Sequence, residues 1–334
     1  MSVESSPFHL VTGGSGFIGA ALVAELLGRG LRVRVLDDHS RGRPARLEPL
    51  LAGPHGAQLE VVTGDVRRLD DVMSATRGCA FVWHLAYVNG TRFFYEKPDL
   101  VLEVGVKGAL NTVEAALACG VTRYVLASTS ETYNTPTHVP TNESERLMIP
   151  DVTNPRFSYG GGKIASELLA LHLGGHRGLE TVIFRPHNVY GPDMGFEHVI
   201  PEIVQRIVEV SDGLTRRRID LPIQGDGTET RAFCYIDDGA RGAAIAGLLG
   251  APGTIYHLGT QLEVEIREVV RLLGEALEVE VNVVPGPLQV GGTRRRCPDI
   301  TRLSGLGYTP EVGLQDGLTR SARWYAEHFL KQRA

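Results

Sequence analysis

Cysteine is scarce in this 334-residue sequence, and the few cysteines form no pattern. The four cysteines lie far apart, with no Cys-x-x-Cys pair and no histidine at the spacing of a metal ligand. We therefore expect reduced, structural thiols rather than a disulfide framework. The eleven histidines form no His-Glu-x-x-His or similar cluster, which argues against a zinc hydrolase, and no metal site is predicted.

Long apolar runs and an excess of positive charge are missing too. No apolar stretch approaches membrane-spanning length, and the first expected strand begins near Phe8, which leaves no room for a signal peptide. The net charge of -5 gives no support to a nucleic-acid-binding surface. We therefore expect a cytoplasmic protein that binds neither membranes nor nucleic acids.

Glycine, in contrast, is concentrated in the informative run TGGSGFIG at residues 12–19. The run follows a short apolar segment and opens an apolar-periodic one at 17–27, so the order is strand, glycine turn, helix. Gly13 permits a tight turn, Gly16 lets the backbone approach a pyrophosphate, and Gly19 lets helix and strand pack closely. The free N–H groups of the helix N-terminus would then face the pyrophosphate.

An acidic residue follows at the spacing that a dinucleotide site needs. The next apolar run, 31–36, ends in Asp37, eighteen residues after Gly19. A carboxylate there accepts hydrogen bonds from an adenosine ribose and repels a 2′-phosphate, so NAD is predicted rather than NADP. The alternative is that Asp37 is only a solvated strand end.

Strand-like and helix-like segments alternate through the first half of the chain and predict an α/β fold of the Rossmann type, with a doubly wound parallel sheet. After Pro186 the pattern loosens, which predicts a smaller C-terminal α/β substrate-binding lobe. We assign residues 1–186, completed by 234–258, to the NAD-binding domain, and 187–233 with 259–334 to the lobe. The segment 255–258 is expected to return to the main sheet. The expected strands are 8–11, 31–36, 59–62, 81–85, 124–127 and 181–184, and further helices are expected at 100–119 and 163–173.

Tyr159 and Lys163 lie four residues apart in the segment SYGGGKIASE. If a helix begins near Tyr159, both side chains share one face. The ammonium, together with a positively charged nicotinamide, would lower the pKa of the tyrosine. The phenolate could then take a sugar hydroxyl proton while hydride leaves the same carbon. A surface pair is the alternative, but the three intervening glycines are poor helix formers that a purely structural helix would hardly use.

With these motifs the chain resembles the extended short-chain dehydrogenases/reductases of the nucleotide-sugar epimerase/dehydratase family. The match runs from end to end. It includes TGGSGFIG at 12–19, Asp37, Gly64-Asp65, HLA at 84–86, residues 128–133, Tyr159 with Lys163, FRPHNVYGP at 184–192, HVIP at 198–201 and GDGTETR at 225–231.

The resemblance implies a tightly held NAD, a nucleotide-diphosphate sugar as substrate, and a homodimer joined through helices such as 100–119 and 163–173. It places Asp65 on the adenine, Thr129 on the sugar O4, and Asn188, Val199 and Arg231 on the diphosphate, and His187 is a further candidate for the sugar. For Arg231 the alternative is a surface ion pair with Asp237 or Asp238. The implied catalytic residues are Thr129, Glu131, Tyr159 and Lys163. The implied cofactor contacts are Gly13, Gly16, Phe17, Ile18, Gly19, Asp37, Asp65, Val66, Leu85, Ala86, Tyr159 and Lys163, and the implied substrate contacts are Ser130, Asn188, His198, Val199, Arg231 and Arg296.

The resemblance leaves the reaction open, because members of the family share only the oxidation at C4. The 4-keto sugar can take hydride back on its other face, which is 4-epimerisation, or lose carbon dioxide or water. Ser130 stands where a 4,6-dehydratase carries the Asp that would act as its acid. The run Thr-Ser-Glu at 129–131, Pro155-Arg156 and Arg296 are similar to UDP-glucuronate decarboxylases. Asp193, where those enzymes have a basic residue, and Asn134 depart from them.

A 4-epimerase needs only Thr129, Tyr159, Lys163 and NAD. A substrate without a carboxylate also suits Glu131 and Asp193 near the sugar, because like charges in a dry pocket are costly. The sequence therefore favours a nucleotide-sugar 4-epimerase, with a decarboxylase or dehydratase as alternatives. A net dehydrogenase or a non-catalytic NAD-binding protein is less favoured. Neither the nucleotide nor the sugar is legible from the sequence.

Overall fold

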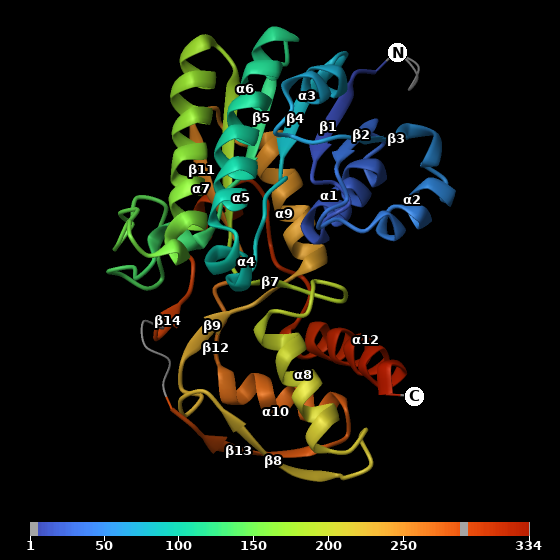
Figure 1. Cartoon of the computed structure of the whole chain (residues 1–334), viewed down its shortest axis with the longest axis vertical. Coiled ribbons are helices and arrows are strands. Elements are labelled where there is room, and N and C mark those ends of the chain that lie inside the picture. Colours follow the sequence, from blue (N-terminus) through green and yellow to red (C-terminus); the bar gives the residue numbers. More distant parts are fainter. Residues whose placement is uncertain (1–5, 288–292, 334) are drawn as a thin grey trace.

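A parallel sheet covered by helices on both faces forms the larger lobe of the computed structural model, which describes residues 6–287 and 293–333 (Figure 1). Within the described residues, seven strands lie side by side, and every neighbouring pair is parallel. The predicted α/β class and doubly wound sheet are confirmed. From edge to edge the strands are β11 (Thr254–Leu258), β6 (Glu180–Pro186), β5 (Arg123–Ala127), β4 (Cys79–His84), β1 (Phe8–Thr12), β2 (Val33–Asp37) and β3 (Leu59–Thr63).

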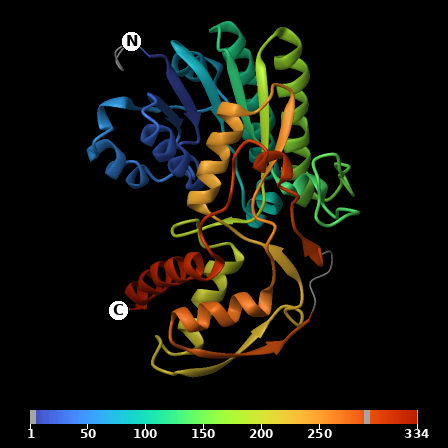
Figure 2. The same ribbon diagram turned by 180° about the vertical axis from the view of Figure 1, so that it is seen from behind.

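Each face of this sheet packs its own layer of helices. One face buries the apolar sides of α1 (Phe17–Gly28) and α9 (Ile236–Leu249), which share a core with Trp83 and Phe184 (Figure 2). The helices on the other face form a second core around Tyr124. They are α3 (Leu69–Thr76), α5 (Pro98–Leu102), α6 (Gly108–Ala118) and α7 (Ser158–Leu168), while the short α2 (Glu48–Ala52) and α4 (Thr91–Glu96) lie in connections.

The expected elements match these bounds with small shifts. The segment 255–258 does return to the sheet, because β11 pairs with β6. The helix expected at 100–119 begins at Pro98 and contains a π-helical stretch, Glu103–Lys107, between α5 and α6. The helix expected at 163–173 begins earlier, at Ser158, so it includes Tyr159.

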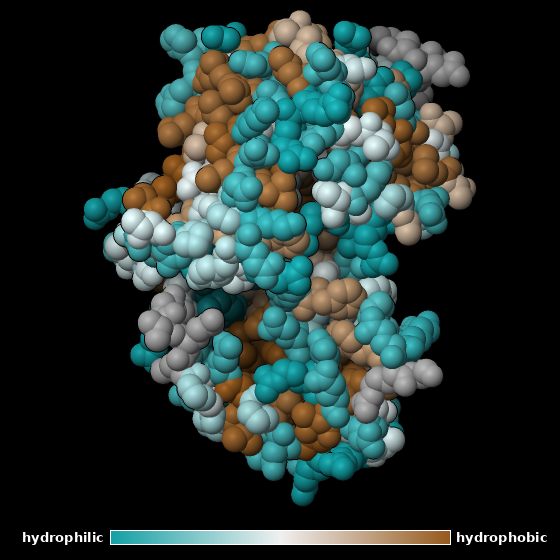
Figure 3. Space-filling model, in the orientation of Figure 1, coloured by the Kyte–Doolittle hydropathy of each residue, from teal (hydrophilic) through white to brown (hydrophobic). Residues whose placement is uncertain are grey.

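The smaller lobe has a separate core, and the molecule narrows to a waist between the two lobes (Figures 1 and 3). Its helices are α8 (Val199–Val210), α10 (Ile266–Ala276) and α12 (Leu314–Arg333). Its core packs these helices against the parallel pair β8 (Arg218–Ile223) and β13 (Glu280–Pro285). The remaining short elements are β7 (Val189–Tyr190), β9 (Thr230–Ala232), β10 (Cys234–Tyr235), β12 (Glu263–Glu265), β14 (Arg295–Arg296) and α11 (Thr301–Ser304). Among the helices that the structure describes, none is long and apolar enough to cross a membrane.

A buried polar network ties the end of β5 to β6 and α7. The Arg185 guanidinium binds the Glu167 carboxylate through two nitrogens, at 2.8 and 2.5 Å, and both side chains are at most 4% exposed. Ser128, directly after β5, donates its hydroxyl proton to the same carboxylate, and Arg185 also donates to the Tyr133 hydroxyl. The pair therefore anchors the segment after β5, where the predicted catalytic residues begin.

Because this ion pair is buried, breaking it should be costly. Glu167→Gln leaves the Arg185 charge without a counter-charge, so we expect the free energy of unfolding to fall by about 3–5 kcal/mol. Urea unfolding followed by circular dichroism measures the change. Glu327→Gln is the matched control, because it breaks an exposed pair with Lys331 and should cost no more than about 0.5 kcal/mol. Equal losses in the two variants would contradict the assignment.

Candidate active site

The glycine turn has the tight geometry that the sequence predicts. Gly13 has a φ of +73°, and a Cβ there would lie 2.7 Å from the Ala86 nitrogen. A Cβ on Gly19 would lie 2.1 Å from the Gly13 carbonyl oxygen, so the helix can approach the turn only without one. Gly16 is the N-cap of α1 and supplies no side-chain cap, which leaves the first N–H groups of the helix available to a ligand. The turn therefore fits the pyrophosphate of a dinucleotide.

Two aspartates stand at the ends of neighbouring strands beside this turn. Asp37, the last residue of β2, is buried and accepts hydrogen bonds from the backbone N–H groups of Ser15, at 3.0 Å, and His39, at 2.8 Å. Asp65 follows β3, and its carboxylate binds the Arg67 side chain at 2.9 Å. Burial alone would raise the pKa of Asp65, but the hydrogen bonds and charge of Arg67 lower it. Both carboxylates are thus held in place by their own neighbours.

Thr129, Tyr159 and Lys163 meet at the carboxyl end of β5. Tyr159 and Lys163 lie one turn apart on α7, as the spacing predicts, and both are buried. The ring of Tyr159 stacks on Phe94 with centroids 5.0 Å apart and meets Tyr87 edge-on. The Lys163 Nζ donates to the Ala127 carbonyl oxygen at 2.6 Å.

Burial dominates the electrostatics of these groups. It raises the pKa of Tyr159, and a hydrogen bond with Thr129 offsets only part of the rise. It also lowers the pKa of Lys163 to about 7, although the charge of Glu167 acts in the opposite direction. The expected lowering of the tyrosine pKa depends on Lys163 together with a positively charged nicotinamide, so it stays a prediction; in the chain by itself the amine is buried and bound to a carbonyl oxygen. A positive charge at the nicotinamide position would act in the required direction.

Glu131 lies in a cluster of positive charge. Its carboxylate accepts a hydrogen bond from Arg296 of β14, and an Arg156 nitrogen lies 4.0 Å away. Burial would raise the pKa of Glu131, but the charge and hydrogen bond of Arg296 outweigh it, so the pKa is lowered. Arg231 is the direct neighbour of Arg296 in the pairing of β9 with β14. The charge and hydrogen bond of Arg296 therefore favour the ionised form of Glu131.

The alternative for Arg231, a pair with Asp237 or Asp238, is wrong. Asp238 binds Arg241, and Asp237 lies 3.8 Å from Arg320. The Arg231 guanidinium instead donates to the Thr230 carbonyl oxygen at 2.7 Å. Burial and the charge of Arg296 both lower the pKa of Arg231. Arg231 therefore lies close to Arg296 and adds its charge to the cluster around Glu131.

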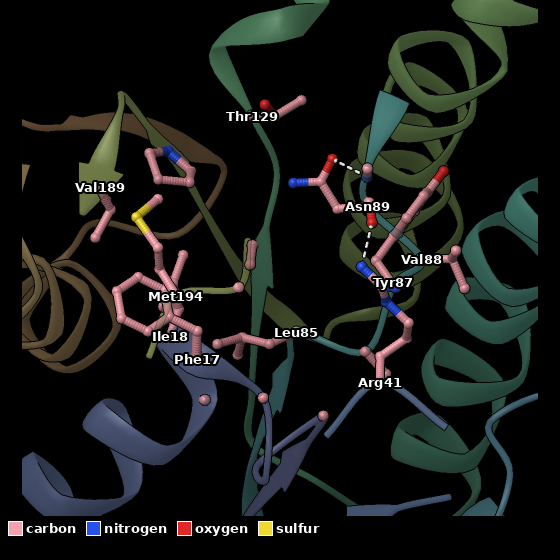
Figure 4. A pocket seen from close by; sticks show the side chains of 18 of the residues that line it. Phe17, Ile18, Arg41, Leu85, Tyr87, Val88, Asn89, Thr129, Val189 and Met194 are labelled. Atoms are coloured by element: carbon pink, nitrogen blue, oxygen red, sulfur yellow. Dashed lines mark hydrogen bonds between the residues drawn. The ribbon is translucent and has the colours of Figure 1, made fainter. Parts of the chain in front are cut away.

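A cavity of about 720 Å³ brings nearly all of the predicted residues together. Figure 4 shows part of its lining, including Phe17, Leu85 and Thr129. Of the residues that the sequence assigns to the cofactor, catalysis or the substrate, only Arg231 does not line it. His187, which the sequence offers only as a further candidate for the sugar, is likewise absent from the lining; it is fully buried, with its ring 4.6 Å from His257, so the expected sugar contact is not supported. The predicted residues that line the cavity are Gly13, Gly16, Phe17, Ile18, Gly19, Asp37, Asp65, Val66, Leu85, Ala86, Thr129, Ser130, Glu131, Tyr159, Lys163, Asn188, His198, Val199 and Arg296.

Several residues that line the cavity were not predicted from the sequence. Three arginines, Arg41, Arg43 and Arg46, come from the loop after β2. Asn89 comes from the loop after β4; its Oδ1 accepts from the Gly90 N–H at 2.8 Å, and its side chain projects into the cavity (Figure 4). Their place in the sequence, directly after predicted strands, could have indicated them, because ligands of parallel sheets bind beyond the carboxyl ends of the strands.

Comparisons with known proteins agree with this geometry. A model of the NAD dependent epimerase/dehydratase family matches residues 9–259. The chain is 28% identical over 328 residues to a UDP-N-acetyl-alpha-D-glucosaminuronate decarboxylase of Bacillus cytotoxicus, covering 95% of this chain and 97% of the relative. It is 30% identical over 320 residues to a UDP-glucose 4-epimerase of Mycolicibacterium smegmatis, covering 95% and 97%.

Solved structures also match the fold of this chain. The fold matches a dTDP-glucose 4,6-dehydratase of Streptomyces venezuelae, solved with NAD bound, with a TM-score of 0.83 and 32% identity. The match covers 96% of this chain and 97% of that one. The cofactor is NAD, and the relatives include enzymes of several reaction classes. The chain belongs to the NAD-dependent epimerase/dehydratase family.

Proposed function

We propose that the protein is a nucleotide-sugar 4-epimerase that works through a transient 4-keto sugar and keeps its NAD throughout. The observation that carries this proposal is the meeting of Thr129, Tyr159 and Lys163 on one wall of the cavity that the glycine turn and Asp37 also line. That set is sufficient to oxidise and reduce a sugar carbon. NAD, when bound, supplies the oxidant that takes hydride from C4 and later returns it.

The chain's own residues then handle the proton and the orientation. Tyr159 accepts the C4 hydroxyl proton as phenolate and returns it after the sugar has turned its other face. Thr129 hydrogen-bonds the same oxygen, and Lys163 supplies positive charge one turn away. For inversion, the sugar must turn while its nucleotide end stays held. The proposed diphosphate contacts are three residues of the smaller lobe that line the cavity, Asn188, His198 and Val199. Arg231, which does not line the cavity, is the fourth proposed contact.

The finer partner and site assignments belong to the same proposal. Asp37 holds the adenosine ribose and Asp65 the adenine. The active form is a homodimer that pairs through α5–α6 and α7, where Leu102 and Leu168 are exposed on the surface of the chain.

A specific observation favours a second candidate, a UDP-glucuronate decarboxylase. Glu131 is neutralised by Arg296, and Arg156 and Arg231 add positive charge beside it. Asp193 is ion-paired with Arg43 and Arg46. The argument that Glu131 and Asp193 would repel a substrate carboxylate is therefore wrong, because arginines compensate both charges. Dehydration gains no such support, since Ser130 supplies no acid and Glu131 is ionised.

Incubation with nucleotide sugars separates the two candidates. With UDP-, GDP- and ADP-hexoses, we expect inversion at C4, seen by NMR, with no steady release of NADH. With UDP-glucuronate, release of carbon dioxide and formation of UDP-xylose would replace the leading proposal by the second. Glu131→Gln sharpens the comparison: 4-epimerisation should persist in this variant, whereas decarboxylation that depends on the Glu131–Arg296 pair should be lost.

Removal of the Tyr159 hydroxyl should stop the chemistry. In Tyr159→Phe we expect kcat to fall by about 10²–10⁴-fold, because the proton then has no acceptor at C4. Steady-state turnover of the active sugar measures the change. Tyr95→Phe is the control, since Tyr95 is exposed and outside the cavity. Near-normal turnover of Tyr159→Phe would refute its assigned role.

Replacement of Asp37 should weaken the preference for NAD. In Asp37→Ala we expect roughly 10- to 100-fold weaker NAD binding, the effect of losing a hydrogen bond to a charged group. Binding of NADP should change less, because the repulsion of its 2′-phosphate is also lost. Titration calorimetry with both nucleotides measures the ratio, with the exposed Asp99→Ala as control. An unchanged preference would contradict the ribose assignment.

A further inference from the structure

Asp193 joins two loops that belong to different lobes. It lies in the loop between β7 and α8, while Arg43 and Arg46 lie in the loop after β2. Arg43 binds one carboxylate oxygen of Asp193 at 2.5 Å, and the Arg46 Nε binds the other at 2.8 Å. Arg46 also donates to the Asp193 carbonyl oxygen at 2.7 Å. Side chain and backbone of Asp193 are thus both held by the cofactor-binding lobe.

On the side of the larger lobe, both arginines are tied to the glycine turn. The Arg43 backbone N–H donates to the Ser15 carbonyl oxygen at 2.9 Å, and the Arg46 guanidinium donates to the same oxygen at 3.0 Å. Ser15 precedes Gly16, the N-cap of α1. The position of these arginines therefore depends on the turn that faces the pyrophosphate.

On the side of the smaller lobe, the residues after Asp193 are tied to α12. The Met194 N–H donates to the Tyr325 hydroxyl at 2.8 Å, and that hydroxyl donates to the Gly195 carbonyl oxygen at 2.8 Å. Met194 packs against the same core as Phe17 and Ile18 at the start of α1, and all three line the cavity (Figure 4). One continuous set of contacts therefore runs from the glycine turn through Asp193 to α12.

This set of contacts, which we name the Asp193 strap, borders the cofactor end of the cavity. Gly16, Arg43, Arg46, Asp193 and Met194 all line the cavity. The Arg46 and Asp193 side chains are 15% and 21% exposed, so their attraction is only partly screened by solvent, whereas Arg43 is 52% exposed. The strap therefore lies directly beside the glycine turn that fits the pyrophosphate.

We propose that Arg43, Arg46 and Asp193 are positioning residues that retain NAD, because the Asp193 strap must open before the cofactor leaves. Retention matters for any reaction that oxidises and then reduces the same sugar, since an early loss of reduced cofactor strands the keto intermediate. The strap also explains the acidic residue at 193. Two arginines from the opposite loop need its negative charge, and a basic residue there would repel them.

Asp193→Asn tests the strap with little change of shape, and asparagine tolerates the φ of +59° at this position. The protein is loaded with NAD and passed through a desalting column at timed intervals, and the nucleotide still bound is measured after denaturation. We expect NAD to dissociate about three- to tenfold faster than from the unmodified protein, as for the loss of the two partly exposed ion pairs of Asp193. The unmodified protein should lose NAD faster at high salt, and the variant should lose most of that salt dependence.

The matched control is Asp316→Asn, which breaks an Asp–Arg pair with Arg320 on the surface of α12, away from the cavity. It should retain NAD normally. Arg43→Gln is the milder second variant, because it removes one of the two ion pairs of Asp193. The double variant Arg43→Gln/Asp193→Asn should lose NAD no faster than Asp193→Asn alone, because Asp193→Asn already removes the pair with Arg43. If Asp193→Asn fails to fold, Arg43→Gln decides the question.

Unchanged NAD retention and unchanged salt dependence in a folded Asp193→Asn or Arg43→Gln would overturn the proposal. The readout is bound nucleotide and needs no sugar substrate. A failure of the proposed 4-epimerase activity would therefore leave this result standing, and the reverse holds too.

Discussion

The close contact between Gly13 and Gly19 is the constraint on which the rest of the site depends. With no Cβ on Gly19, α1 begins directly against the turn after β1, and its free N–H groups open at the carboxyl edge of the sheet. The glycine turn also packs against Ala86, which follows β4. Every other group of the cavity is placed relative to this edge, because neighbouring strands of a parallel sheet end there.

Charge compensation is the second organising feature. Within the described part of the cavity, Asp65, Glu131 and Asp193 each bind an arginine. A carboxylate in a partly dry cavity is stable only when it is paired or hydrogen-bonded, as Asp37 is by two backbone N–H groups. The consequence is chemical: a carboxylate held ionised by arginine is a poor acid, which is consistent with the proposal that Thr129, Tyr159 and Lys163 form the reactive centre. Because arginines compensate these carboxylates, the cavity can accept a neutral or an acidic sugar. A substrate experiment is therefore needed to distinguish the reaction classes.

The two lobes divide the work between them. The sheet and its helices hold the cofactor side, and the buried pair of Glu167 and Arg185 keeps the segment after β5 in place. The smaller lobe contributes Asn188, His198 and Val199 at the other end of the cavity. Arg296 and the Asp193 strap connect the two sides of the cavity through ion pairs between segments that are distant in the sequence.

The sequence by itself determined the fold class, the glycine turn, Asp37 and the shared helix face of Tyr159 and Lys163. Those features arise from residues close in the chain, where the period of a strand or helix converts spacing directly into position. Only the tertiary structure decided the pairing of Glu131 with Arg296 and of Asp193 with Arg43 and Arg46, which are joined across 165, 150 and 147 residues. It also decided that burial raises the pKa of Tyr159 and lowers that of Lys163. Desolvation and long-range ion pairs have no local spacing, because they depend on which segments exclude water from one another after the chain has folded.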